Sequence, residues 1–154
     1  MSKLFETVTP HQKITVWESE GVRSLYLDDD LQFDDNNELA VHEAFLNPLM
    51  DFDYQLQDVL ILGGGDGGMA RTTLDWFPDV NITQCELDDK VIKVCKKYFP
   101  KLNNDGKVFD DIELVIGDGQ EYINQSIRPQ GGGRRFDTTI LDLTIYPQFD
   151  FESI

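Results

Sequence analysis

Long apolar runs, secretory signals and paired cysteines are all missing from this sequence of 154 residues. Its longest uncharged apolar run, around Val59–Leu62, is far too short to cross a bilayer, so we expect no contact with membranes. Residues 1–20 hold no basic stretch followed by an apolar one, so we expect no signal peptide and a cytoplasmic protein. The two cysteines, Cys85 and Cys95, lack the spacing of a metal site, and we expect them as reduced thiols in the core.

Basic residues are also scarce. Lysine and arginine together number 13, against 29 aspartates and glutamates, which gives a formal net charge of −16 at pH 7. Because such a surface repels phosphate backbones, we expect no nucleic-acid partner. It attracts cations, small polyamines among them, but a need for solubility or a salt-rich habitat produces the same charge. The charge by itself therefore identifies no substrate.

The residues that are present are enough for a packed domain. A hydrophobic content of 40% with 10 phenylalanines supports a core, and the length fits one domain with a small N-terminal appendage. Residues 12–19 and 23–33 are predicted as paired strands, and residues 36–50 as a helix. We assign residues 1–35 to an N-terminal β-hairpin region and residues 36–154 to the main domain.

Strands and helices alternate through the main domain. This alternation predicts a parallel sheet with helices on both faces, an α/β fold of the Rossmann-like, class I methyltransferase type. In that fold the four predicted strands lie in the spatial order 3-2-1-4. The predicted strands are residues 59–62, 81–88, 111–119 and 136–142, and the predicted helices are residues 69–76, 89–102 and 121–127.

A glycine-rich loop follows the first strand of this sheet and opens the next helix. Its glycines allow a tight turn and let backbone N–H groups approach a ligand closely. Glu86 lies 20 residues beyond Asp66, at the end of the next strand, where an exposed carboxylate can accept both ribose hydroxyls of a nucleotide. The loop residues are Gly63, Gly64, Gly65, Asp66, Gly67 and Gly68.

Two carboxylates separate adenosylmethionine-type ligands from dinucleotides. Asp66 lies inside the loop, where its charge repels a pyrophosphate but suits an amine or a sulfonium. Asp118, before Gly119, ends the third strand and is placed to bind an adenine amino group. Each residue also has a purely structural interpretation: Asp66 as a turn residue, Asp118 as a helix cap, Glu86 as a solvated strand end. Their shared position at consecutive strand ends favours a binding site.

A fourth carboxylate, Asp142, ends the last predicted strand. There it lies beside the first strand and faces the reactive carbon of an adenosyl-sulfonium ligand, where it can hold and deprotonate an attacking amine. A strand-end aspartate that starts a turn is the structural alternative. Amino-group DNA methyltransferases carry a Pro-Pro-aromatic run at this point, and this chain has DLTIYP instead.

Together these motifs resemble the polyamine aminopropyltransferases, above all the spermidine synthases. The resemblance runs from about His11 to the end of the chain. The LD-x-x-LQ segment, followed ten residues later by HE, is specific to this family among methyltransferase-like folds. The matching segments are HQKI, LYLDDDLQF, the HE of VHEAF, VLILGGGDGG, QCELDDKVI, GDG and FDTTILD.

The resemblance implies a binding mode for decarboxylated S-adenosylmethionine, a co-substrate rather than a tightly bound cofactor. Gln12 and Gln32 contact it from the hairpin side, and His42 lies near its thioether and adenosine. Asp66 binds the terminal amine of its aminopropyl arm. The glycine loop, together with Gly119, frames the ligand.

The resemblance also implies roles for the remaining carboxylates. Glu86 holds the ribose and Asp118 the adenine. Asp142 is the catalytic carboxylate that takes a proton from putrescine, or a similar diamine, as its nitrogen attacks the carbon next to sulfur. No metal is needed, because the sulfonium is already a good leaving group and the enzyme mainly orients the reactants.

Three departures from the family pattern affect the diamine side. The family has a Tyr before the His of the HE pair, where this chain has Val41, and a second Asp three residues after the catalytic one, where it has Ile145. The chain also ends at Ile154, so we expect the fifth strand and the closing strands to be absent and the sheet to be incomplete at its C-terminal side. We therefore expect a homo-oligomer, or a partner chain that completes the sheet.

Three hypotheses of function follow. The first is an aminopropyltransferase that makes spermidine from putrescine and releases methylthioadenosine. The second is an S-adenosylmethionine-dependent methyltransferase. The third is a non-catalytic or partner-dependent module that binds an adenosyl ligand. The N-terminal motifs favour the first over the second, whereas Ile145 and the early end of the chain favour the third.

Overall fold

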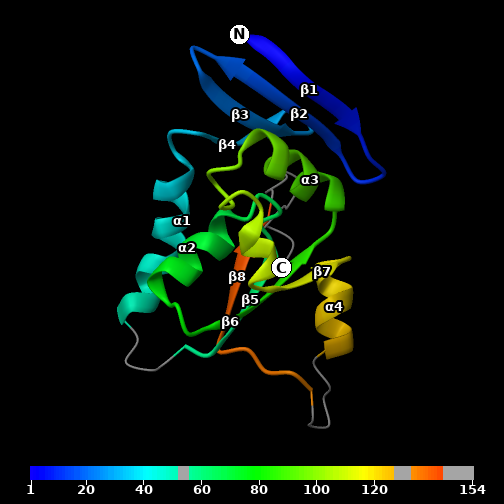
Figure 1. The fold of residues 1–154 in the computed structure, drawn as a ribbon. Coiled ribbons are helices and arrows are strands. Elements are labelled where there is room, and N and C mark those ends of the chain that lie inside the picture. Colours follow the sequence, from blue (N-terminus) through cyan, green and yellow to red (C-terminus); the bar gives the residue numbers. More distant parts are fainter. Residues whose placement is uncertain (52–55, 127–132, 144–154) are drawn as a thin grey trace, which may run out of the picture.

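The structure is a computed structural model that describes residues 1–51, 56–126 and 133–143. Two four-stranded sheets organise it, an antiparallel one at the N-terminus and a parallel one in the main domain (Figure 1). Ile145 and the rest of the chain after Leu143 lie outside the described residues. No described helix is long and apolar enough to span a membrane. Cys85 and Cys95 are both buried free thiols, as predicted.

The N-terminal sheet has four strands rather than the two that the sequence predicts. The predicted second strand is divided by a two-residue turn, where Asp28 and Asp29 adopt positive φ values of 49° and 71°. Aspartate tolerates this left-handed conformation better than most residues, and Lys13 N–H donates to the Asp28 carboxylate over 2.8 Å. The strands, in spatial order, are β1 (Ser2–Val8), β2 (Lys13–Ser19), β3 (Val22–Leu27) and β4 (Asp30–Asp34).

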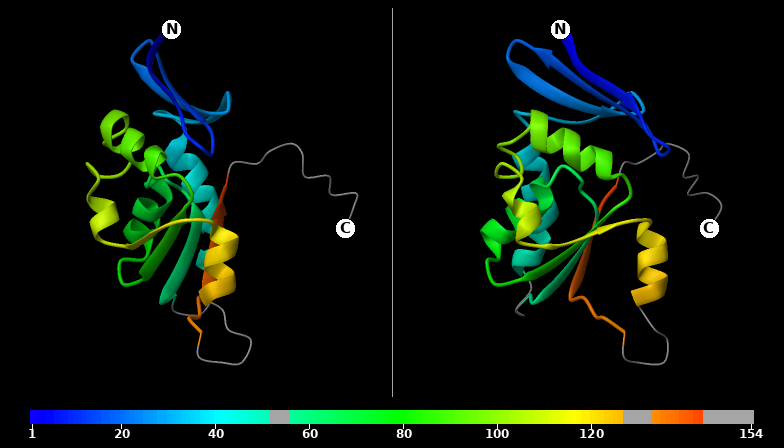
Figure 2. Two further views of the ribbon diagram at one scale, coloured as in Figure 1. Left: turned by 90° about the vertical axis from the view of Figure 1, so that its right-hand side faces the viewer. Right: turned by 45° about the vertical axis from the view of Figure 1, so that its right-hand side comes forward.

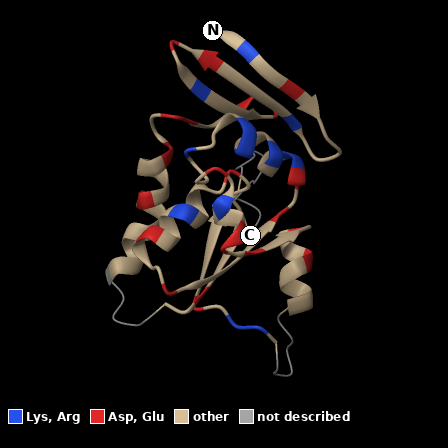
Figure 3. Cartoon of the chain, in the orientation of Figure 1, with Lys and Arg blue, Asp and Glu red and all other residues tan. Residues whose placement is uncertain are grey.

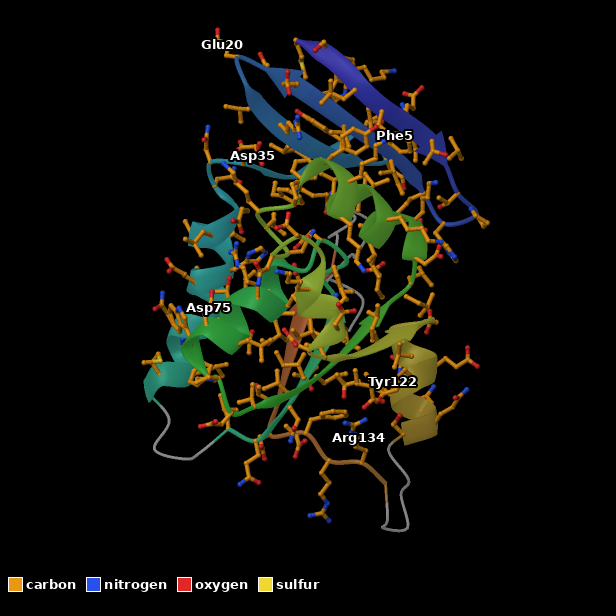
Figure 4. The ribbon with its side chains drawn as sticks, viewed as in Figure 1. Phe5, Glu20, Asp35, Asp75, Tyr122 and Arg134 are labelled. Carbon is orange, nitrogen blue, oxygen red and sulfur yellow. The ribbon has the colours of Figure 1, made fainter. Side chains whose placement is uncertain are left out.

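The additional strand β1 was not predicted because most of it is exposed. Its alternation is weak, and it is held in place by antiparallel pairing with β2. Phe5, labelled in Figure 4, connects it to the main domain, because its ring centroid lies 5.6 Å from that of Tyr98. Pairing of this kind depends on a neighbouring strand, so the residues of β1 alone do not indicate it.

The parallel sheet has the predicted strand order. β7 (Glu113–Ile116), β6 (Asn81–Glu86), β5 (Asp58–Gly63) and β8 (Thr138–Asp142) lie side by side in that order. Their carboxyl ends therefore meet at one edge, which is where α/β sheets bind ligands. Within the described part of the chain, β8 is an outer strand of this sheet.

Helices cover both faces of the parallel sheet, as predicted (Figure 2). Val59 and Ile61 of β5 face α1 (Glu38–Leu46) and α2 (Gly68–Trp76), whereas Leu60 and Leu62 face α4 (Gly119–Ser126). Because successive side chains of a strand point to opposite faces, these four residues pack against helices on both sides of the sheet. The remaining helices are α3 (Asp89–Tyr98) and the 3₁₀ helices η1 (Asn47–Asp51) and η2 (Lys107–Asp110).

Helix α3 joins the two sheets. Val91, Val94, Cys95 and Phe99 on or just after this helix pack against the inner face of the N-terminal sheet. Phe33 of β4 meets Phe99 edge to face, with ring centroids 4.8 Å apart. The N-terminal sheet therefore lies above the carboxyl edge of the parallel sheet (Figure 1). Residues of this sheet line a cleft between the two.

The helix predicted for residues 36–50 is shorter than expected. It leaves α geometry after Leu46, just before Pro48, because proline cannot donate to the preceding turn. His42 and Leu46 are buried, whereas Leu39 and Phe45 are 47% and 45% exposed.

Candidate functional site

A cleft of about 800 Å³ opens at the carboxyl edge of the parallel sheet. Its floor is the glycine loop after β5, and its roof is the N-terminal sheet. Its walls are α1, the end of β6, the start of α4 and the end of β8. The cleft lining excludes Gly68 of the glycine loop and includes all but one of the other residues that the sequence predicts for the site, namely Gln12, Gln32, His42, Gly63, Gly64, Gly65, Asp66, Glu86, Asp118, Gly119 and Asp142.

Gly67 is the exception. It adopts a φ of +84° directly before α2, and a side chain there would meet the ring of Phe109 at 2.7 Å. Gly67 therefore turns the chain behind the cleft and does not line it.

Bare backbone in the glycine loop makes room for two carboxylates. A Cβ on Gly65 would lie 2.8 Å from Glu86 Oε2, and a Cβ on Gly64 would lie 3.0 Å from Asp142 Oδ2. Gln84 fixes the loop from below by donating to the carbonyls of Gly63 and Gly64, over 3.0 and 2.6 Å. Sequence reasoning missed Gln84, although an amide in the middle of a buried strand is itself a signal of a polar contact.

His42, Asp66 and Asp142 meet on one side of the cleft. Each offers an atom that lies within 4.8 Å of the atoms offered by the other two. His42 Nε2 is 4.0 Å from Asp66 Oδ1, which also accepts the Gly68 N–H over 2.6 Å. Asp142 Oδ2 is buried and has no hydrogen-bond partner among residues 1–51, 56–126 and 133–143. A small cation would be surrounded by acceptor atoms here.

Burial and crowding of like charges shift the pKa values in this group. Burial, and next the charge of Asp66, raise the pKa of Asp142 to about 7. Burial also raises the pKa of Asp66, although the His42 charge and the Gly68 N–H favour its ionised form. Burial alone would lower the pKa of His42, but the hydrogen bond to Glu38 and the charges of Asp66 and Asp142 outweigh it and raise that pKa. The protonation of this group is therefore set by burial together with the mutual approach of the three side chains.

Glu38 is a second residue that sequence reasoning missed. Its Oε2 is 3.1 Å from His42 Nδ1, one helical turn along α1. Arg71 of α2 holds the same carboxylate, with Nη2 3.2 Å from Oε2. The spacing of four residues between Glu38 and His42 was a usable signal for this pair.

Glu86 is buried, which corrects the expectation of an exposed strand end. Only 7% of it is exposed, and its Oε1 accepts the Asp88 N–H over 2.9 Å. Burial raises its pKa to about 7, against the opposing effect of the Asp88 N–H. One carboxylate oxygen therefore anchors the start of α3, while the other lies against Gly65 at the cleft surface.

Asp118, Gln12 and Gln32 lie on the far side of the cleft from Asp142. Asp118 is exposed, and its Oδ1 accepts the Glu121 N–H over 2.8 Å at the start of α4, so the helix-cap interpretation is correct. It nevertheless lines the cleft. Gln12 donates to Asp88 over 3.2 Å, and Gln32 donates to the Asp30 carbonyl over 3.0 Å. Both glutamines are half-buried in the roof.

The wall beside Asp142 is apolar. Val41 and Phe45 of α1, with Leu141 and Leu143 at the end of β8, line the cleft there and are each about half exposed. The carboxylates of Asp142, Asp66 and Glu38 line the same cleft, and Glu38 is paired with Arg71. The cleft thus has an acidic side around Asp66 and Asp142 that borders an apolar one.

Comparison with known families identifies one match. The family model described as the spermine/spermidine synthase domain matches residues 38–152. Among curated proteins, polyamine aminopropyltransferases are similar over nearly the whole chain. The protein of Buchnera aphidicola is 30% identical over 142 residues, covering 92% of this chain and 48% of its own length. That of Pyrococcus abyssi is 34% identical over 151 residues, covering 92% of this chain and 50% of its own length.

Solved structures give the same result. A crystal structure of spermidine synthase in complex with the transition state analogue AdoDATO superimposes with a TM-score of 0.79 at 27% identity. A crystal structure of the Thermotoga maritima spermidine synthase gives a TM-score of 0.78, also at 27% identity. Both comparisons cover 91% of this chain and 47% of the other. The chain spans about half the length of the relatives it matches.

Proposed function

The chain belongs to the spermine/spermidine synthase family. From this premise we propose that it binds decarboxylated S-adenosylmethionine and takes part in the transfer of the aminopropyl group to putrescine or a similar diamine. The observation that carries the proposal is the meeting of Asp66, His42 and Asp142 on one side of a cleft that Glu86 and Asp118 also line. Methylthioadenosine is the other product of such a transfer.

Asp66 is the residue that selects the donor. Its carboxylate lies in the glycine loop, next to the bare backbone that a ligand can approach. An ammonium gains a charge-assisted hydrogen bond there, whereas the additional carboxylate of ordinary S-adenosylmethionine meets a like charge. The donor is therefore expected to be the decarboxylated form.

Asp142 is the residue that accepts the proton of the attacking amine. Its pKa of about 7 is matched to that task near neutral pH, because a general base works best when its pKa is near the operating pH. The N–H bond of the amine breaks as its nitrogen attacks the carbon next to sulfur, and the C–S bond electrons leave with methylthioadenosine. The apolar wall of Val41, Phe45, Leu141 and Leu143 would then accept the methylene chain of the amine.

Binding measurements test this proposal. Calorimetry should give an affinity for decarboxylated S-adenosylmethionine about ten- to a hundredfold higher than for ordinary S-adenosylmethionine, corresponding to about 1.5–3 kcal/mol. The substitution Asp66→Asn should remove most of that preference while leaving methylthioadenosine affinity unchanged. Equal affinities in the unmodified protein would argue against an aminopropyl donor and favour a methyltransferase.

A second function is supported by one substitution in the cleft. Val41, which lines the cleft, stands where the family has a tyrosine. A non-catalytic or partner-dependent module that binds the donor fits this observation. Tight binding of the donor without spermidine formation would identify this function, and rapid spermidine formation by the chain alone would exclude it.

A further inference from the structure

His42 is a buried base with two different neighbours. Only 4% of it is exposed, and Glu38 Oε2 lies 3.1 Å from its Nδ1. A carboxylate acceptor fixes the proton on Nδ1, so Nε2 is the atom whose protonation varies. That atom points to Asp66 Oδ1 at 4.0 Å and belongs to the same group of atoms as Asp142.

Two contacts of Asp66 oppose the rise in its pKa that burial causes. Its Oδ1 accepts the Gly68 N–H over 2.6 Å at the start of α2, and the charge of His42 lies 4.0 Å away; both favour the carboxylate form. An imidazolium at His42 and a donor ammonium would thus be two cations that compete for one carboxylate.

We propose that His42 exchanges its proton for the ammonium group of the donor, with Glu38 as the residue that positions its ring. In the free protein the imidazolium of His42 neutralises Asp66. When the ammonium of decarboxylated S-adenosylmethionine takes its place beside Asp66, the Nε2–H bond of His42 breaks and the proton passes to the solvent. One positive charge enters and one leaves, so the charge balance around Asp66 is kept.

The exchange leaves Nε2 of His42 unprotonated, so its lone pair can accept a proton during the proposed reaction. Neutral His42 turns Nε2 toward the space between Asp66 and Asp142, which makes it a second proton acceptor next to the carboxylate that receives the amine proton. This inference rests on the proposed function, since it takes the donor ammonium as the competing cation. It assigns His42 a role in proton exchange and Glu38 a role in positioning the His42 ring.

All charged groups that face His42 enter this equilibrium. Glu38 lies on its own helix, Arg71 on α2, Asp66 in the glycine loop and Asp142 at the end of β8. Arg71 pairs with Glu38 and stays charged in both states. The three carboxylates favour the imidazolium, and of these only Asp66 is predicted to be claimed directly by the donor ammonium.

The first experiment titrates His42 in the free protein by NMR. The chain has only two histidines, so His11→Gln assigns the remaining imidazole signal to His42. The pKa of His42 should lie above 6.5 and should fall in both Asp66→Asn and Glu38→Gln. Glu43→Gln removes the same charge from the same helix away from the cleft and should change it little. A His42 pKa that Asp66→Asn leaves unchanged would overturn the inference, whatever the protein binds.

The second experiment counts protons released on binding. Calorimetry near pH 6.5 in buffers of different ionisation enthalpy should show about 0.5–1 more proton released with decarboxylated S-adenosylmethionine than with methylthioadenosine, which lacks the ammonium. Glu86 titrates equally in both complexes and cancels in the difference. His42→Gln should abolish the excess release.

The outcomes separate this inference from the function on which it rests. Equal proton release with the two ligands, or an excess that persists in His42→Gln, would overturn the exchange while leaving donor binding established; the persistent excess would assign the proton to Asp142. Failure of both ligands to bind would refute the proposed function instead, and the NMR titration would still decide the state of His42.

Discussion

At the scale of single residues, Glu86 and Asp142 are carboxyl groups kept in surroundings that disfavour their charge. Burial raises the pKa of each to about 7, and neighbouring acids add to the effect. Groups of this kind are concentrated at functional sites, where a binding or proton-transfer task requires them despite their cost to stability. The two residues therefore connect the stability of the fold to pH.

Glu86 provides a prediction with a defined sign. Because its pKa is about 7 in the folded protein and near 4.5 when unfolded, the folded state binds more protons between these values. Its contribution to the free energy of unfolding should fall by about 2–3 kcal/mol as pH rises from 4.5 to 7 and stay level above. Glu86→Gln should thus stabilise the protein at pH 8, which urea unfolding at pH 5 and pH 8 would measure.

The same substitution should damage binding. Glutamine replaces one of the two carboxylate oxygens with an NH₂ donor and removes the charge, so the ribose hydroxyls lose acceptor capacity and methylthioadenosine affinity should weaken by about 1–3 kcal/mol. Asp75→Asn, at an exposed position on α2, is the control and should change neither quantity. A Glu86→Gln protein that binds methylthioadenosine normally would remove Glu86 from the site.

At the scale of elements, the contact between α1 and α2 holds His42 in place. The first residue of α2, Gly68, lies against the imidazole, and a Cβ there would lie 2.3 Å from His42 Cε1. Helices can approach this closely only where one of them presents bare backbone. The geometry of the acidic side of the cleft therefore depends on one glycine outside the cleft lining.

Substitution of this glycine should disturb the site through the helix contact. Gly68→Ala should destabilise the protein by about 1–3 kcal/mol, because the methyl group overpacks a buried interface, and should shift the NMR signal of His42. Gly117→Ala is the matched control, since a Cβ there would meet nothing within 4 Å. Unchanged stability and an unshifted His42 signal in Gly68→Ala would show that the two helices separate easily.

The outer strand β8 offers a second test at this scale. Its outward backbone groups are a template for pairing, and Leu141 next to the cleft is 56% exposed. We expect self-association through this edge or through the N-terminal sheet. If the copies associate through β8, Leu141→Lys should abolish the association. If they associate through the N-terminal sheet, Leu31→Lys on its outer strand β4 should abolish it. Sedimentation velocity distinguishes the two, and a protein that stays monomeric at high concentration would contradict both.

For the whole molecule, we expect the net charge of −16 to oppose self-association. Acidic side chains are spread over both sheets and the connecting loops, while several lysines gather on α3 (Figure 3). Repulsion between copies should weaken as salt screens it, since the Debye length falls from about 30 Å at 0.01 M to about 10 Å at 0.1 M. The associated fraction should therefore rise from 0.01 to 0.1 M salt. A fraction that falls with salt would indicate an interface made of ion pairs.

Much of the fold and of the site was predictable because its signals are local. The order of the parallel strands follows from the alternation of strand and helix, and the glycine loop with Asp66, Glu86, Asp118 and Asp142 follows from their places at strand ends. These features depend on backbone geometry that a few residues specify directly. The strand β1, the turn at Asp28 and Asp29, and the orientation of α1 depend on pairing and packing partners far along the chain.

The order of the residues is enough to show which carboxylates belong to the carboxyl edge of the sheet, because parallel strands bring their ends together whatever surrounds them. The protonation of those carboxylates depends instead on contacts that form only in the folded chain. Burial of Glu86, and the approach of His42 to Asp66 and Asp142 from a separate helix, set the pKa values on which the proposed binding and proton transfer depend. Such values reflect the distance between charges and their access to water, and both quantities arise only when the chain has folded.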